Sequence, residues 1–98
     1  MTFLFDRQIT IADFSDRFGK AFDVQVAGHQ LSLTLHACQE LPGAKRAGGA
    51  FRLEFLGPVN PQLGQGVFVF RIDSDQYEIF IVPVGPTPQG MKYEAIFY

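Results

Sequence analysis

The sequence predicts a mainly β fold: a small antiparallel barrel or roll of about six strands, with one short N-terminal helix packed on it. From Ala21 onward, apolar and polar residues alternate with the period of two that is typical of strands, in runs separated by Gly, Pro and polar residues. Before Ala21, the apolar residues follow a helical spacing instead. A chain of 98 residues supports one hydrophobic core, so we expect a single domain over residues 1–98.

The expected helix runs over residues 11–18. Thr10 and Asp13 have the spacing of a capping box, with Asp in place of the usual Glu. Gly19 supplies a residue that readily adopts the left-handed conformation in which many helices end. A helix of two turns does not persist alone, so its apolar stripe must dock on the sheet. This stripe consists of Ile11, Phe14 and Phe18.

Six strands are expected after the helix. The first three, at about residues 22–26, 31–36 and 51–55, are apolar at alternate positions and therefore have one face in water. Two longer Gly- and Pro-containing connections, at residues 39–49 and 57–66, flank the third strand. The last three strands are expected at residues 67–73, 77–84 and 91–97, and a proline-rich loop at residues 85–90 separates the final two. Pro83 lacks an amide donor, which predicts an edge, a bulge or a strand end there.

The last three strands are apolar on both faces. Such strands are normally covered on both sides. We therefore expect the N-terminal helix either to lie across their outer face or to plug one end of the barrel. The alternative is that another subunit covers this face, since exposed apolar patches mark interfaces. On the same outer face, Glu78 and Glu94 are expected to form ion pairs with Arg71 or Lys92.

Composition argues against several classes of partner. The formal net charge is −2, and of the scattered basic residues only Lys45 and Arg46 are adjacent, so nucleic-acid binding is not expected. No apolar run is long enough to span a membrane, and the N-terminal residues do not resemble a signal peptide. These features favour a cytoplasmic protein. Cys38 is the single cysteine, so no intrachain disulfide can form.

The motifs that resemble chemical sites are incomplete. His36 and Cys38 are two residues apart on one expected strand, which predicts that they share a face, but no further metal ligands follow at a recognisable spacing. Residues 73–75 (DSD) lack the rest of a calcium loop and predict a hairpin turn instead. Residues 43–48 have the glycine spacing of a phosphate-binding loop but not its Lys and Ser/Thr. We expect no metal, no cofactor and no enzymatic activity.

Three segments resemble the sequence pattern of a family of small bacterial proteins of unknown function. They are Phe51–Pro58 (FRLEFLGP), Phe80–Gly85 (FIVPVG) and Gly90–Phe97 (GMKYEAIF). The resemblance covers the second half of the chain well, and the first half only in its Phe-x-Val and Leu-x-Leu strands. It brings no catalytic residues. Because some members are encoded near phage-tail-collar-like proteins, it implies an assembly or accessory role.

The sequence therefore favours a non-enzymatic protein-interaction or assembly accessory module, associated with a phage-tail-like or secreted-fibre system. The expected partner is an unidentified protein, with a second copy of the chain as one possibility. Two alternatives remain open: a carrier of a small apolar ligand, and an enzyme that uses His36 with a carboxylate. The candidate partner-binding residues are Lys45, Arg46, Phe80 and Val82.

Overall fold

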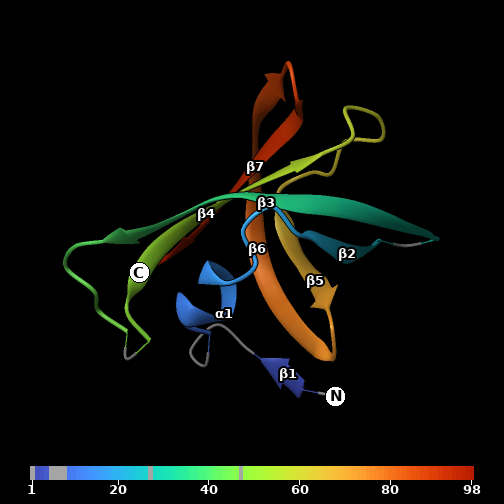
Figure 1. Cartoon of the computed structure of the whole chain (residues 1–98). Coiled ribbons are helices and arrows are strands. Elements are labelled where there is room, and N and C mark those ends of the chain that lie inside the picture. Colours follow the sequence, from blue (N-terminus) through green and yellow to red (C-terminus); the bar gives the residue numbers. More distant parts are fainter. Residues whose placement is uncertain (1, 5–8, 27, 47) are drawn as a thin grey trace.

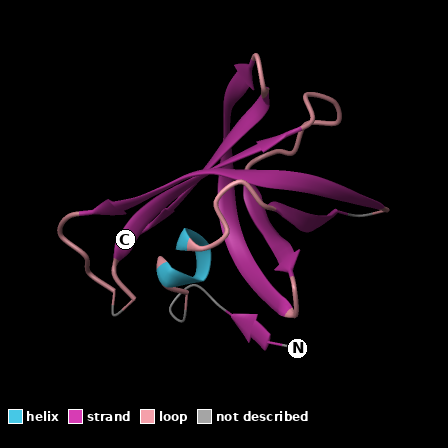
Figure 2. Ribbon diagram, in the orientation of Figure 1, coloured by secondary structure: helices cyan, strands magenta, loops and turns pink. Residues whose placement is uncertain are grey.

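The computed structural model describes residues 2–4, 9–26, 28–46 and 48–98 (Figure 1). Within these residues, the strands form a single sheet, and one short helix accompanies it (Figure 2). This confirms the expected mainly β fold with a short N-terminal helix. The elements are β1 (Thr2–Leu4), α1 (Ala12–Ser15), β2 (Ala21–Val26), β3 (His29–Leu41), β4 (Ala50–Gly57), β5 (Gly66–Ile72), β6 (Asp75–Thr87) and β7 (Gly90–Phe97).

The sheet closes on itself into a roll. Hydrogen-bonded neighbours follow the order β6-β5-β2-β3-β4-β7, and β7 pairs in turn with β6. All of these pairings are antiparallel, as expected. Strand β1 is an element that the alternation pattern did not predict, and it pairs with β6 in parallel.

The long strand β6 divides its pairing between two neighbours. Residues 75–81 pair with β5, and residues 82–87 pair with β7 on the other edge. Below the segment that they share, β6 and β7 run apart, and α1 lies in the opening between them (Figure 1). The N-terminal segment therefore closes the splayed end of the roll.

Helix α1 does not lie across the outer face of the last three strands, so that expectation was wrong and the end-plugging arrangement is the one observed. Phe14 is fully buried, and its ring centroid lies 5.1 Å from that of Tyr77, 5.9 Å from that of Phe22 and 6.2 Å from that of Phe51. Phe14 thus contacts β2, β4 and β6 from inside the roll.

The helix is also shorter than expected. The Asp13 carboxylate accepts a hydrogen bond from the Thr10 amide at 2.8 Å, which is one half of the predicted capping box. After Ser15 the chain forms turns, and Gly19, with φ +80°, donates its amide to the Leu35 carbonyl at 2.8 Å. Because helical geometry ends early, Phe18 leaves the predicted stripe and is 64% exposed.

Aromatic rings fill the core. Phe22 meets Phe55 edge to face at a centroid distance of 5.6 Å, and Phe51 stacks on Phe97 at 4.5 Å. The Tyr93 hydroxyl accepts a hydrogen bond from the buried Leu63 amide at 2.8 Å, so it fastens the β4–β5 connection to the core. Among the described residues, no polar or charged residue is classed as buried.

Strands β3 and β6 continue beyond their predicted ends, and each contains a β-bulge. In β6 the register shifts between Pro83 and Gly85, which confirms a bulge at this proline. Pairing then resumes through Pro86 to Thr87, so the loop expected at residues 85–90 is only a tight turn. In β3 the register shifts between Leu35 and Ala37, and the strand continues to Leu41.

Candidate interaction surface

Four large apolar side chains are exposed on the outer side of β5, β6 and β7. Val67 on β5 lies directly opposite Phe80 on β6, and Val82 follows two residues along on the same face. Val82 pairs with Glu94 of β7, and Ile96 lies two residues beyond Glu94. We call this set the outer strip; its members and exposed fractions are Val67 (57%), Phe80 (49%), Val82 (37%) and Ile96 (57%).

The alternate residues of the same strands face the core. Ile79 and Ile81 are fully buried on β6, and Ala95 and Phe97 are buried on β7. The two-sided apolar pattern therefore arises because one side packs into the roll while the other side meets solvent. The structure brings the predicted residues Phe80 and Val82 together in the outer strip, whereas sequence reasoning did not select its other members as site residues.

The two predicted basic residues lie elsewhere, in the connection between β3 and β4. Lys45 is exposed, and its amide donates to the Tyr98 carbonyl at 2.8 Å. Arg46 is half-buried, and its guanidinium donates to the carbonyls of Ile9 at 2.5 Å and Gly49 at 2.9 Å. The same guanidinium lies over the core ring of Phe97, 5.4 Å from its centroid. Arg46 therefore links Ile9 of the N-terminal segment to the β3–β4 connection, and it does so from the inner side of the sheet.

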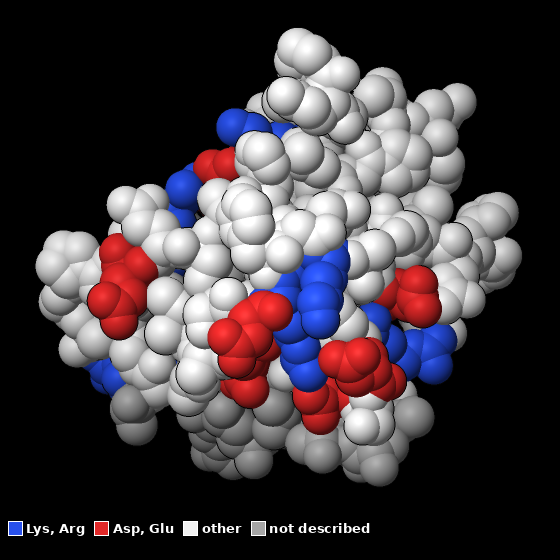
Figure 3. Space-filling model, in the orientation of Figure 1, with Lys and Arg blue, Asp and Glu red and all other residues white. Residues whose placement is uncertain are grey.

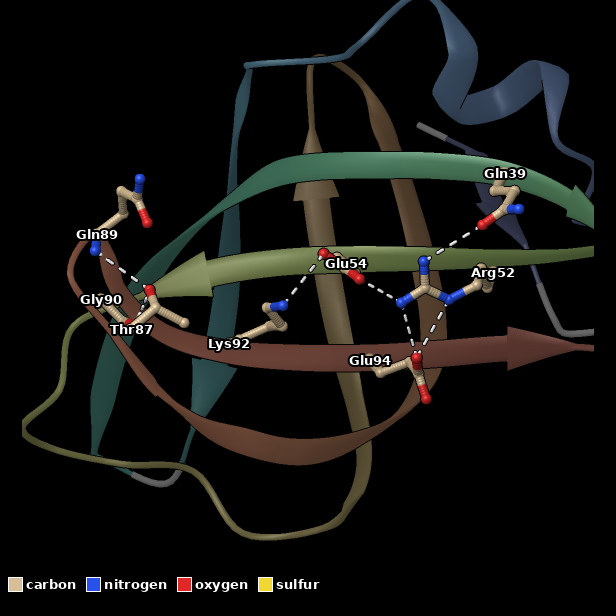
Figure 4. Close-up of polar contacts among 8 residues, drawn as sticks. All are labelled: Gln39, Arg52, Glu54, Thr87, Gln89, Gly90, Lys92 and Glu94. Atoms are coloured by element: carbon tan, nitrogen blue, oxygen red, sulfur yellow. Dashed lines mark hydrogen bonds and ion pairs between the residues drawn. The ribbon is translucent and has the colours of Figure 1, made fainter.

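A charged network borders the outer strip on β4 and β7 (Figure 4). Glu54 and Glu94 are direct cross-strand partners, a placement in which like charges repel. Arg52 relieves this repulsion because it donates to Glu94 Oε2 through Nε at 3.1 Å and Nη2 at 2.8 Å, and also to Glu54. The hydrogen bond from Arg52 lowers the pKa of the Glu54 carboxyl. Lys92 completes the network, with its Nζ 3.7 Å from Glu54 Oε1.

This network differs in part from the expected pairing. Glu94 binds Arg52, and the partner of Lys92 is Glu54. Among the described residues, Glu78 and Arg71 form no ion pair, although both lie on the outer face of β5 and β6. The choice of partners depends on the β4–β7 register, which only the folded sheet defines.

Residues 9–97 match the model of one protein family, described as a domain of unknown function, DUF6916. The chain belongs to this family. The matched region includes α1 and strands β2 to β7, whereas β1 lies outside it. No curated protein matches the chain, and no solved structure matches it either. Membership in a family of unknown function agrees with the resemblance found in the sequence.

A second polar cluster of this DUF6916 domain fastens the N-terminal segment to the β5–β6 hairpin. Arg17 donates to the Tyr77 hydroxyl at 2.6 Å and to Asp75 Oδ2 at 2.7 Å. Burial raises the pKa of Tyr77 to about 12, and its hydroxyl donates to Asp75 Oδ2 at 3.5 Å. The acidic residues of the 73–75 hairpin thus bind Arg17, and the depression of about 310 Å³ beside them is part of this structural contact.

The metal-like and enzyme-like motifs of the domain do not converge into a site. The β3 bulge turns His36 outward while Cys38 packs against the core, so the prediction that they share a face was wrong. Within the described part of the chain, no group of three or more His, Cys, Asp or Glu residues could hold a metal ion. Also among those residues, no helix is long and apolar enough to cross a membrane.

Two depressions between described residues are open to solvent and lined mainly by polar groups. One of about 640 Å³ lies at the β2–β3 turn, where it is lined by Gln25, Val26, Gly28, His29 and Gln30. On the face shown in Figure 3, acidic and basic side chains lie next to one another, and neither sign forms a continuous patch. The outer strip is therefore the feature of the described surface that most needs a functional explanation.

Proposed function

We propose that this domain is a non-enzymatic protein-interaction module that binds its partner through the outer strip. The observation that supports this function is the exposed apolar surface of β5 and β6, where Val67 and Phe80 are direct cross-strand partners and Val82 follows on the same face. On β7, Ile96 lies two residues beyond Glu94, the partner of Val82. Contiguous exposed apolar surface of this kind is typical of interfaces. The Arg52 network beside it supplies the polar rim that such interfaces have.

The biological setting is part of the same proposal. The resemblance to a bacterial family with members encoded near phage-tail-collar-like proteins supports an accessory role in assembling a phage-tail-like or secreted-fibre system. We propose that the domain acts in the cytoplasm, where such components are made. We propose Lys45 as a separate contact, because it is exposed on the β3–β4 connection, beside the C-terminal residue Tyr98 and apart from the outer strip.

Photocrosslinking from two matched valine positions tests this function. Val67 belongs to the outer strip, whereas Val59 lies in the β4–β5 connection with almost the same exposed fraction, 56% against 57%. A photoreactive amino acid in place of Val67, in the full chain produced at native level in its own cells, is expected to give a discrete protein adduct. The same amino acid in place of Val59 is expected to give none. Absence of an adduct from positions 67, 80 and 82, or equal adducts from position 59, would contradict the proposal.

A further inference from the structure

We infer that the occupant of the outer strip is a second copy of this chain, packed sheet face to sheet face in a symmetric dimer. This inference rests on the proposed function and names its partner. A symmetric interface uses the same patch on both subunits, so the patch must be complementary to itself. The balance of charges on the outer face meets this condition. The area of the face then indicates how strong the dimer is.

The charges around the strip cancel. Strands β4 and β7 contribute Arg52 and Lys92 together with Glu54 and Glu94, so this flank has two cations and two anions. The other flank adds one of each sign, because the outer face of β5 and β6 carries Arg71 and Glu78. The whole chain has a formal net charge of −2, so the negative excess lies away from this face. Two copies can therefore approach strip to strip without net like-charge repulsion.

This balance separates a second copy from other partners. A nucleic acid requires an excess of basic side chains, and a strongly charged protein partner would be matched by an excess of the opposite sign. The outer strip lies between equal numbers of cations and anions. A second copy of the chain presents the same apolar residues and the same balanced charges, so it fits this surface. In sheet-on-sheet packing, alternate residues of facing strands interdigitate across a layer about 10 Å thick. Val67, Phe80 and Val82 are branched or aromatic residues of the kind that fills such a layer.

The width of the face predicts a weak dimer. Strand β5 flanks residues 75–81 of β6, whereas β7, with β4 beyond it, flanks residues 82–87, so the outer face is a staggered band. With strands about 4.8 Å apart and about 3.4 Å per residue, two strands of about seven residues and three of about five present on the order of 500 Å² per copy. Two copies would then bury about 1,000 Å², which is near the lower limit for a specific interface. We therefore expect a reversible dimer whose population depends on concentration in the micromolar range.

Sedimentation equilibrium over a concentration series tests the inference. The mass of the wild-type chain is expected to rise from 10.9 kDa towards twice that value as concentration increases. Val67→Lys is expected to keep the monomer mass throughout, because it places a charge in the apolar layer. Val59→Lys, with a matched exposure outside the strip, is expected to dimerise like the wild type. Val82→Lys provides a second strip variant, and near-UV circular dichroism identifies variants that remain folded.

Two results would overturn the dimer. One is a wild-type mass of 10.9 kDa at every concentration; the other is equal weakening by Val67→Lys and Val59→Lys. A monomer that nevertheless crosslinks from position 67 to a different protein refutes the second copy and leaves the interaction function standing. A monomer without any crosslink from the strip removes both proposals.

Discussion

Phe14→Ala is expected to lower the free energy of unfolding by about 4 kcal/mol. Phe14 is fully buried and contacts aromatic rings on three strands, so its removal leaves a cavity at the splayed end of the roll. A domain of this size has a total stability of about 5–10 kcal/mol, so the loss would remove a large share of it. Urea unfolding followed by tyrosine fluorescence or circular dichroism measures the change.

The control for this prediction is Phe18→Ala. Phe18 belongs to the same N-terminal segment and has the same side chain, but it is 64% exposed. We expect it to change stability by no more than about 0.5 kcal/mol. Similar effects of the two substitutions would show that the N-terminal segment does not close the core.

Gly90→Ala is expected to destabilise the domain by about 3 kcal/mol. Gly90 follows the turn between β6 and β7 and has φ +132°, a conformation that side chains rarely adopt. A Cβ atom at this position would also lie 2.4 Å from the Gly57 carbonyl oxygen. Because that oxygen belongs to the backbone of β4, it cannot move aside without disturbing the β4–β7 pairing.

Gly64→Ala provides the matched control. A Cβ at Gly64 meets no atom within 4 Å, and the residue is exposed in the β4–β5 connection. This substitution is expected to be neutral or to stabilise by up to about 1 kcal/mol, since it restricts the unfolded chain. Thermal unfolding of both variants measures the difference. A Gly90→Ala protein as stable as Gly64→Ala would contradict the close approach of β4 and β7.

Alternation was sufficient to predict the main strands and, for β2, β3 and β4, the side that is buried. Phe22, Val24, Leu33, Leu35 and the alternate residues of β4 are all buried as their spacing predicts. The extents of β3 and β6 were predicted less well, because each strand contains a bulge at which the period of two is interrupted. A bulge has no simple sequence signal, although Pro83 indicated one of the two.

The exposure of the outer strip could not be predicted from the sequence. Val67, Phe80 and Ile96 have the high β-propensity that favours strands whether or not both faces are buried. Their two-sided pattern predicts a cover, either the helix or another subunit, but Phe14, the apolar side chain that the helix contributes to the core, packs inside the roll. The Arg52 network was also beyond prediction, because it joins residues about 40 positions apart through the β4–β7 register.

The described part of the chain leaves the outer strip open for a partner. Nuclear magnetic resonance with a soluble paramagnetic probe tests it directly, in solutions dilute enough to hold monomers. The methyl groups of Val67, Val82 and Ile96 are expected to relax several-fold faster than those of the buried residues Val24 and Ile79. Equal protection of both sets in the dilute monomer would show that the chain covers its own strip, and would contradict the account.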